Sequence, residues 1–210
     1  MEKLLLTGFE PFLSNPINPT MEVVQALNGK SVGQFEIVGH VLSVDFAKAP
    51  EQFMALVEEV KPTMIVSLGL AAGITKISPE RVALNVKDGE KDNAGNAFED
   101  APIKEDGDVA YLSTLPIRKI VNRLNSAGYP TAISNSAGTY LCNNIMYEGL
   151  YYAAKNEAIR AAGFIHIPAS FELAIEHGRI PGWSMRDLTA AIEMALEVCA
   201  ENVEVAGKVL

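Results

Sequence analysis

Short apolar runs alternate along the chain with longer segments in which apolar residues recur every three or four positions. The short runs predict buried strands over residues 4–7, 35–46, 64–69, 131–134 and 163–168, and a further extended segment over 77–88. The longer segments predict helices over residues 19–26, 49–60, 116–125, 141–158 and 185–205. Strands that alternate with helices are typical of an α/β protein with a mostly parallel sheet.

Cap and turn residues bound the predicted elements. Asn18 is a suitable N-cap with Pro19 at the first helical position, and Ser184 is placed to cap the last helix. Residues 88–108 are rich in Gly, Asp and Asn and predict a long surface loop. Loops of this length in compact domains are often functional or mobile.

We therefore predict one α/β domain over residues 1–210, a three-layer α/β/α sandwich with a mostly parallel, twisted central sheet. In open sheets of this class, functional groups gather at the carboxyl ends of the strands. Residues 8–12, 69–80 and 136–142 lie at such ends in this sequence, and so does His166.

Composition and charge argue against some classes of binding partner. The chain is 49% apolar and 20% charged, as in ordinary globular proteins, and its 26 acidic and 17 basic residues give a net charge of −9. This balance argues against nucleic acid and anionic membranes as partners. No apolar run approaches the roughly 18 residues of a spanning helix, and the start of the chain lacks the features of a signal peptide. We expect a cytoplasmic protein.

Cys142 is the strongest candidate for chemistry. It follows a strand and a glycine turn, and it lies in the first turn of the helix predicted over 141–158. The free N–H groups and partial positive charge of a helix N-terminus favour a thiolate and can hold an oxyanion. The alternative interpretation is a buried structural cysteine. We assign that interpretation to Cys199, the other cysteine, and two cysteines make neither a disulfide framework nor a zinc site.

His166 and Glu80 are candidates to assist Cys142. His166 ends an apolar strand, and a thiol nucleophile needs a base whose pKa is near neutral. A third group usually orients such a histidine, and Glu80 follows the exit of an extended segment. The alternatives are a satisfied core histidine and a surface acid paired with Arg81.

The first loop places two aromatic residues, Phe9 and Phe12, at the end of the first strand. They form either the wall of a small apolar pocket or a plug of the core. The sequence has no P-loop, no G-x-G-x-x-G and no G-x-S-x-G motif, so nucleotide binding and a serine nucleophile elbow have no support.

Four segments together resemble the pyroglutamyl peptidase type I family, also called pyrrolidone carboxyl peptidases. They are TGFEPF with Asn18-Pro19-Thr20, SLGLAAG, ISPERVALNV, and SNSAGTYLCNNIMY followed by GFIHIP. They occur in the order and at the spacing of the family, and the likeness covers nearly the whole chain.

The resemblance implies a single catalytic domain that acts as a cysteine exopeptidase. It would hydrolyse the N-terminal pyroglutamyl residue from peptides through a thioester, without a metal or an organic cofactor. The resemblance makes Cys142 the nucleophile, His166 the base and Glu80 the orienting acid. It also implies that the substrate is bound by Phe9, Phe12, Asn18 and Leu70. The expected assembly is a homotetramer or a homodimer.

Two departures from the family pattern bear on activity. Leu70 stands where many relatives have glutamine, which removes one polar contact near the substrate. Residues 86–95, VKDGEKDNAG, lack the arginine and proline that are usual there, and this loop is one residue shorter. The altered 86–95 loop leaves open a weakened protein that binds pyroglutamyl peptides without cleaving them. A nucleosidase-like or phosphorylase-like enzyme on the same scaffold is a further alternative, because fold alone does not decide function.

Overall fold

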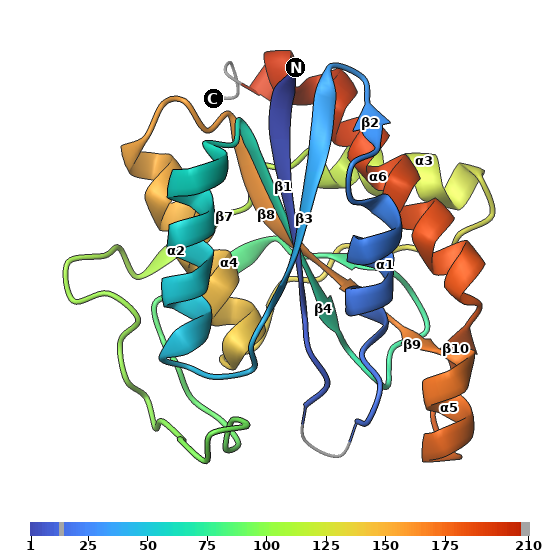
Figure 1. The fold of residues 1–210 in the computed structure, drawn as a ribbon, viewed down its shortest axis with the longest axis horizontal. Coiled ribbons are helices and arrows are strands. Elements are labelled where there is room, and N and C mark those ends of the chain that lie inside the picture. The colour runs from blue at the N-terminus through green and yellow to red at the C-terminus, as the bar shows by residue number, and fades with distance from the viewer. Residues whose placement is uncertain (13–14, 207–210) are drawn as a thin grey trace.

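A six-stranded sheet organises the computed structural model, which describes residues 1–12 and 15–206 (Figure 1). The order of the strands is β2 (Ser31–Val32), β3 (Phe35–Leu42), β1 (Glu2–Phe9), β4 (Met64–Leu70), β8 (Ala161–Ile167) and β5 (Ser78–Pro79). The four inner strands β3, β1, β4 and β8 run parallel, whereas β2 and β5 pair antiparallel at the two edges. The prediction of a mostly parallel sheet is confirmed.

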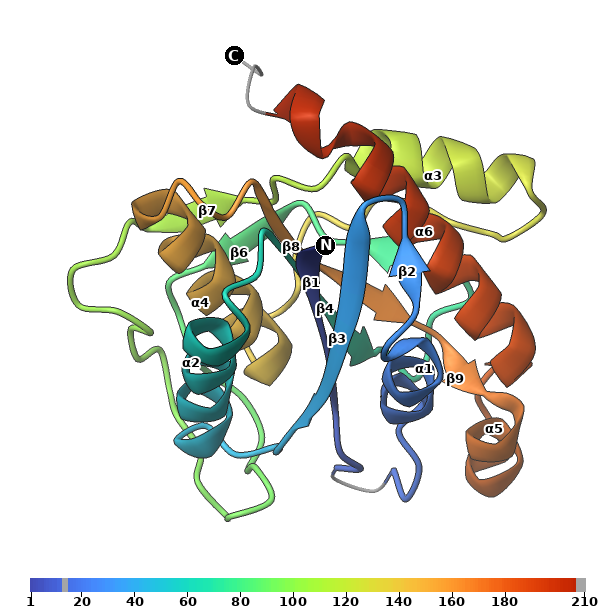
Figure 2. The ribbon, with the colours of Figure 1, turned by 45° about the horizontal axis from the view of Figure 1, so that its top comes forward.

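Helices cover both faces of this sheet (Figure 2). One face carries α1 (Pro19–Leu27), α3 (Ile117–Ser126) and α6 (Met185–Ala206), and the other carries α2 (Lys48–Val60) and α4 (Leu141–Lys155). The predicted caps are confirmed, because Asn18 Oδ1 accepts from the N–H of Thr20 at 3.1 Å and Ser184 Oγ accepts from the N–H of Asp187 at 3.0 Å. The three-layer α/β/α architecture is therefore confirmed. Residues 207–210, which the predicted domain includes, lie outside the described residues.

Two small strand pairs lie outside the main sheet. An antiparallel pair joins β6 (Val82–Leu84) to β7 (Ala110–Leu112), and the stretch between them has neither helix nor strand. The long loop predicted over residues 88–108 falls within this stretch. After β8, a parallel pair of β9 (Ala169–Ser170) and β10 (Gly182–Trp183) encloses the short helix α5 (Phe171–His177).

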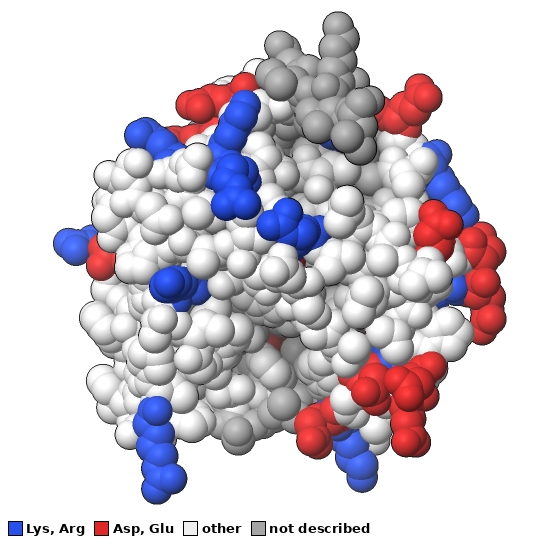
Figure 3. Space-filling model, turned by 180° about the vertical axis from the view of Figure 1, so that it is seen from behind, with Lys and Arg blue, Asp and Glu red and all other residues white. Residues whose placement is uncertain are grey.

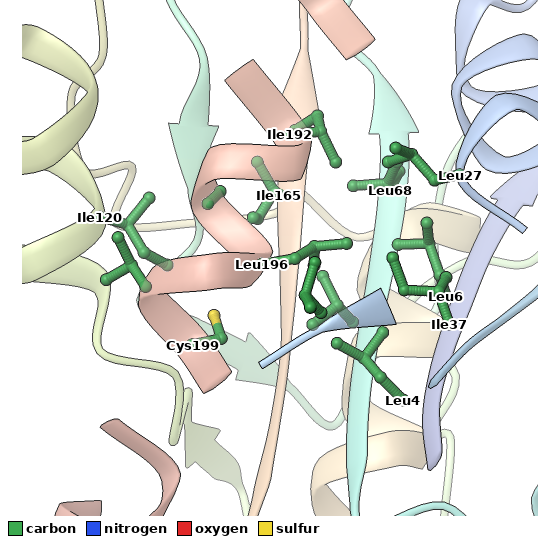
Figure 4. Packing of buried hydrophobic residues seen from close by; sticks show 14 of the residues in the cluster. Leu4, Leu6, Leu27, Ile37, Leu68, Ile120, Ile165, Ile192, Leu196 and Cys199 are labelled. Atoms are coloured by element: carbon green, nitrogen blue, oxygen red, sulfur yellow. The ribbon is translucent and has the colours of Figure 1, made fainter. Parts of the chain in front are cut away.

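The sheet separates two apolar cores. On one side, Leu4, Leu6 and Ile165 face Leu196 of α6 (Figure 4). Cys199 belongs to this core and is fully buried, and burial raises the pKa of its thiol to about 12, so its structural interpretation holds. The second core packs the other face of the sheet against α2 and α4.

The close packing of α2 and α4 depends on a glycine. A Cβ atom on Gly149 of α4 would lie 3.3 Å from Cζ of Phe53 in α2. A contact this tight leaves little room for a side chain at Gly149, so the helix keeps a residue of low helix propensity there. Helix α4 is thereby held firmly against its neighbours.

The prediction of a strand over residues 131–134 is wrong. Thr131 and Ser134 make only isolated bridges, to Ile77 and Glu80 respectively. A segment this short, next to the two-residue strand β5, exchanges too few backbone hydrogen bonds to form a continuous ladder. Its bridges nevertheless hold the chain around Glu80 in place.

Element ends and short elements also differ from the prediction. The strand predicted over 35–46 ends at Leu42, the helix predicted over 141–158 ends at Lys155, and the extended segment 77–88 is divided into β5 and β6. No prediction was made for β2, β7, α5, β9 or β10, because runs of two to seven residues show too little periodicity to be detected. Among the described residues, no helix is long and apolar enough to cross a membrane.

Truncation of a single side chain in the core on the α6 side is expected to lower the stability of the fold strongly. Leu6 is completely buried in the central strand β1, so Leu6→Ala is expected to lower the free energy of unfolding by about 3 kcal/mol. Ile175 is 78% exposed, and Ile175→Ala is expected to change that free energy by less than about 0.5 kcal/mol. Urea unfolding of the two variants and the parent measures both values. Equal effects of the two substitutions would contradict this account of the core.

Candidate active site

The carboxyl ends of β4 and β8 bring together residues that are almost a hundred positions apart in the sequence. In the parallel register of these strands, Gly69 lies opposite His166. On the other side of β8, Ser78 of β5 pairs with His166. The histidine is therefore held between two strands at the end of the sheet, as its position in the sequence predicted.

Cys142 is the second residue of α4, in the first turn as predicted. No side chain caps this helix at Tyr140, so backbone N–H groups of its first turn remain available to a ligand. The start of α4 lies directly against the end of β4, since a Cβ atom on Gly69 would be only 2.8 Å from Cys142 Sγ. Any side chain at position 69 would displace the sulfur.

Glu80 orients the imidazole ring of His166. Its Oε1 lies 2.7 Å from His166 Nδ1, and the carboxylate is only 2% exposed. The N–H of Glu80 also donates to the carbonyl of Phe164 at 2.9 Å, which fixes the acid beside β8. The alternative pairing with Arg81 is wrong, because Arg81 Nε donates to Asn135 Oδ1 at 2.7 Å.

The surroundings of His166 favour its charged form. Burial by itself lowers the pKa of His166, but the charge and hydrogen bond of Cys142 and the hydrogen bond of Glu80 outweigh burial and raise that pKa to about 10. With Nδ1 occupied by Glu80, the second ring nitrogen is left for the sulfur. The ring of His166 can therefore stay charged beside Cys142 at neutral pH.

A small, mostly apolar cavity opens beside Cys142. The four residues expected to bind substrate all line it, together with three that were not predicted: Phe9, Phe12, Asn18 and Leu70, then Val44, Tyr140 and Leu141. Phe9 is also buried in the core on the α4 side, so the wall and plug interpretations of the first loop both apply. Among the described residues that line the cavity, Asn18 alone has a side-chain amide, and its Nδ2 donates to the carbonyl of Glu10 at 3.0 Å.

Tyr140 lines the cavity and was not predicted from the sequence. Its ring stacks against Phe12 at a centroid distance of 6.5 Å, and its hydroxyl donates to the carbonyl of Lys91 at 3.3 Å. Burial, together with the charges of Asp92 and Cys142, raises the pKa of Tyr140 to about 12, so this hydroxyl remains a donor. An aromatic residue two positions before the candidate nucleophile was the available signal.

Comparison with known proteins shows the family to which the chain belongs. The family model described as pyroglutamyl peptidase matches residues 2–202. The chain belongs to this family. It is 58% identical over 197 residues to the pyrrolidone-carboxylate peptidase of Lysinibacillus sphaericus, covering 94% of this chain and 96% of the relative. It is 41% identical over 206 residues to that of Pyrococcus furiosus, covering 96% and 99%.

Solved structures of the family share the fold. A mutant pyrrolidone carboxyl peptidase from Pyrococcus furiosus matches with a TM-score of 0.93 at 41% identity, covering 96% of this chain and 99% of that one. The enzyme from Thermococcus litoralis matches with a TM-score of 0.94 at 36% identity, covering 98% and 96%. The family resemblance and the fold class inferred from the sequence are both confirmed.

The Glu80–His166 contact predicts the pH dependence of the reaction. In the parent protein the imidazolium is lost only as the pH rises toward about 10. Glu80→Gln keeps an oxygen for Nδ1 but removes the charge, so the alkaline limb of kcat/KM is expected to move down by about one pH unit. The value of kcat/KM at neutral pH is expected to fall by about 10²-fold or more.

The matched control is Glu105→Gln, the same change at an exposed position. Rate profiles from pH 5 to pH 10.5 should be unchanged in this control. An alkaline limb of Glu80→Gln that coincides with that of the parent would show that Glu80 does not support the charged ring.

Proposed function

We propose that this chain hydrolyses the N-terminal pyroglutamyl residue from peptides as a cysteine exopeptidase, with a thioester on Cys142 as the intermediate. The observation that carries the proposal is the position of Cys142, at an uncapped helix start and beside the buried pair of His166 and Glu80, in a member of the pyroglutamyl peptidase family. A thiolate next to an imidazolium is the arrangement that cysteine nucleophiles require.

In the proposed reaction, Cys142 gives its proton to His166, and the thiolate attacks the pyroglutamyl carbonyl. His166 then protonates the nitrogen of the leaving peptide, and the C–N bond breaks to leave the thioester. A water molecule that gives its proton to His166 hydrolyses the thioester and releases pyroglutamate. Glu80 keeps the ring oriented through each transfer, because its bond to Nδ1 fixes which nitrogen faces the sulfur.

The start of α4 supplies the stabilisation of the oxyanion. Negative charge develops on the carbonyl oxygen when the sulfur attacks, next to backbone N–H groups in the first turn of the helix. These groups have no capping side chain, and the partial positive charge of the helix N-terminus adds to their effect. The same turn thus carries the nucleophile and the donors for the oxyanion.

The cavity beside Cys142 suits a neutral five-membered lactam. Phe9, Phe12 and Tyr140 offer flat apolar surfaces, and Asn18 offers an amide. None of the described lining residues carries a carboxylate to pair with a free ammonium group, which would lose much of its hydration on entering the cavity. This chemistry favours a pyroglutamyl N-terminus over an ordinary charged one. The alternative of a nucleosidase-like enzyme finds no support in this lining.

We also propose that the 210 residues act as one catalytic domain in the cytoplasm and that the protein assembles as a homotetramer or homodimer. The match of the family model over residues 2–202 supports a single catalytic unit. The assembly and its place in the cell rest on the resemblance. Sedimentation of the purified protein measures the assembly directly.

The direct test is release of aminomethylcoumarin from its pyroglutamyl conjugate under reducing conditions. The parent protein is expected to cleave this conjugate and not the prolyl, alanyl or glutamyl conjugates. Cys142→Ser is expected to reduce kcat by at least about 10³-fold, because the hydroxyl is not ionised at neutral pH. Cys199→Ser keeps a cysteine at position 142 and should retain activity.

Two outcomes would oppose the proposal. Turnover by Cys142→Ser at the rate of the parent would exclude Cys142 as the nucleophile. Folded parent protein that binds pyroglutamyl peptides without cleaving them would favour the binding protein considered from the sequence.

A polar substitution of Leu70 is expected to raise the activity. This residue lines the cavity and is almost fully buried, but it offers the lactam no hydrogen bond. Leu70→Gln has a similar volume and adds an amide, so kcat/KM is expected to rise by about fivefold, the effect of one hydrogen bond. Leu70→Met is the control of similar size without an amide. Equal kcat/KM values for the two variants would exclude a polar contact from this position.

A further inference from the structure

The long loop between β6 and β7 contains one acid that differs from its neighbours. Glu90, Glu99 and Asp100 are exposed, and acidic side chains gather where this loop lies, at the lower right of Figure 3. Asp92 is only 6% exposed, although Lys91 and Asn93 on either side of it are exposed. A buried carboxylate requires partners, and its partners show what it holds together.

The two oxygens of Asp92 have separate tasks. Oδ1 accepts from the N–H groups of Ala94 at 3.0 Å and Asn96 at 2.8 Å, which closes a turn within the loop. Oδ2 accepts from the N–H of Phe46 at 2.9 Å, which belongs to the segment after β3. Oδ2 also accepts from Asn96 Nδ2 at 3.3 Å. One oxygen therefore shapes the loop, and the other fastens it to a different segment.

Asn93 extends this connection to a third segment. Its N–H donates to the carbonyl of Val44 at 2.9 Å, and its Nδ2 donates to the carbonyl of Pro11 at 3.0 Å and to Glu10 Oε1 at 3.2 Å. Glu10 Oε1 also accepts from the N–H of Val44 at 3.0 Å. Residues 92–93, 44–46 and 10–11 are thus joined by hydrogen bonds between their backbones and a few side chains.

The joined segments carry the walls of the cavity beside Cys142. Val44 lines the cavity, and Phe12 follows Pro11 directly. Phe46 packs edge-on against Tyr140 at a centroid distance of 5.1 Å, and Tyr140 stacks on Phe12. The hydroxyl of Tyr140 donates to Lys91, next to Asp92. Movement of residues 92–93 would therefore release three walls of the cavity together.

We propose that Asp92 and Asn93 are positioning residues that form a latch, defined as these two residues and their bonds to residues 10–11 and 44–46. The latch holds the aromatic walls of the cavity at the spacing that a lactam ring requires. This inference rests on the proposed function. None of the bonds of the latch involves Cys142, His166 or Glu80, so it controls the binding of substrate and leaves the bond-breaking step unchanged.

Asp92 keeps its negative charge at neutral pH. Burial by itself raises the pKa of Asp92, but the N–H groups of Phe46 and Asn96 outweigh burial and lower that pKa below its ordinary value. The carboxylate therefore stays ionised and accepts its hydrogen bonds throughout the neutral range.

Asp92→Asn tests the latch with little disturbance of the loop. The new amide keeps one oxygen for Ala94 and Asn96, but it places an NH₂ group against the N–H of Phe46. KM for the pyroglutamyl-aminomethylcoumarin conjugate is expected to rise by about tenfold, the effect of one unsatisfied buried donor, with kcat within twofold of the parent. Asn93→Ala, at an exposed position, is expected to raise KM in the same way.

The controls separate positioning from a general loss of structure. Glu90→Gln makes the matched change at an exposed acid two positions away, and its KM should equal that of the parent. Alkylation of Cys142 by iodoacetamide, a small reagent with no lactam ring for the aromatic walls to hold, should keep its rate in all variants. Thermal unfolding of Asn93→Ala should match the parent within a few degrees.

The outcomes are distinct. A rise in KM alone for Asp92→Asn and Asn93→Ala supports the latch. Unchanged KM in both, or a fall in kcat at unchanged KM, overturns it. If the parent itself shows no turnover, the proposed function fails. Calorimetric binding of L-pyroglutamate to the parent and to Asp92→Asn then decides the latch separately, because a tenfold loss of affinity supports it and equal affinities overturn it.

Discussion

A buried carboxylate that holds a buried imidazole is the interaction on which this site depends. Removing Glu80 and His166 from water is costly, and the 2.7 Å bond between Glu80 Oε1 and His166 Nδ1 offsets part of that cost, while Glu80 Oε2 is buried without a hydrogen-bond partner among the described residues. This bond fixes the direction of the ring, and it leaves one nitrogen for Cys142. The short strand β5, the bridge of Glu80 to Ser134 and the register of β8 all bring the acid to that place.

The side chains proposed to react and the walls of the cavity beside them are held in place by different parts of the structure. The side chains proposed to react lie at the ends of paired strands and at the start of a packed helix, where the backbone has little freedom. The cavity beside Cys142 is lined in part by residues outside the helices and strands, such as Phe12 and Val44, and the side chains of Glu10 and Asp92 connect the segments that carry them. Changes in the loops can therefore alter which substrates enter while the chemistry remains intact. The departure of residues 86–95 from the family pattern falls entirely on the loop side.

Much of the fold could be predicted from the sequence, because long apolar periods and caps such as Asn18 report local structure directly. Cys142 could be placed at a helix start for the same reason. The burial of Glu80 could not be predicted, since its bond to His166 spans 86 positions and the adjacent Arg81 offered a local partner. The family resemblance supplied that assignment, whereas the latch at Asp92 resembled an ordinary polar loop in the sequence.

The order of the strands has a consequence for how the chain acquires activity. Strand β8 lies between β4 and β5, although both of those strands precede it by more than eighty residues. While the chain is being synthesised, the facing edges of β4 and β5 must wait for a partner that emerges late. His166 arrives with that strand, so the pair of Glu80 and His166 forms only after the sheet has closed. Recovery of activity during refolding would therefore time the insertion of β8.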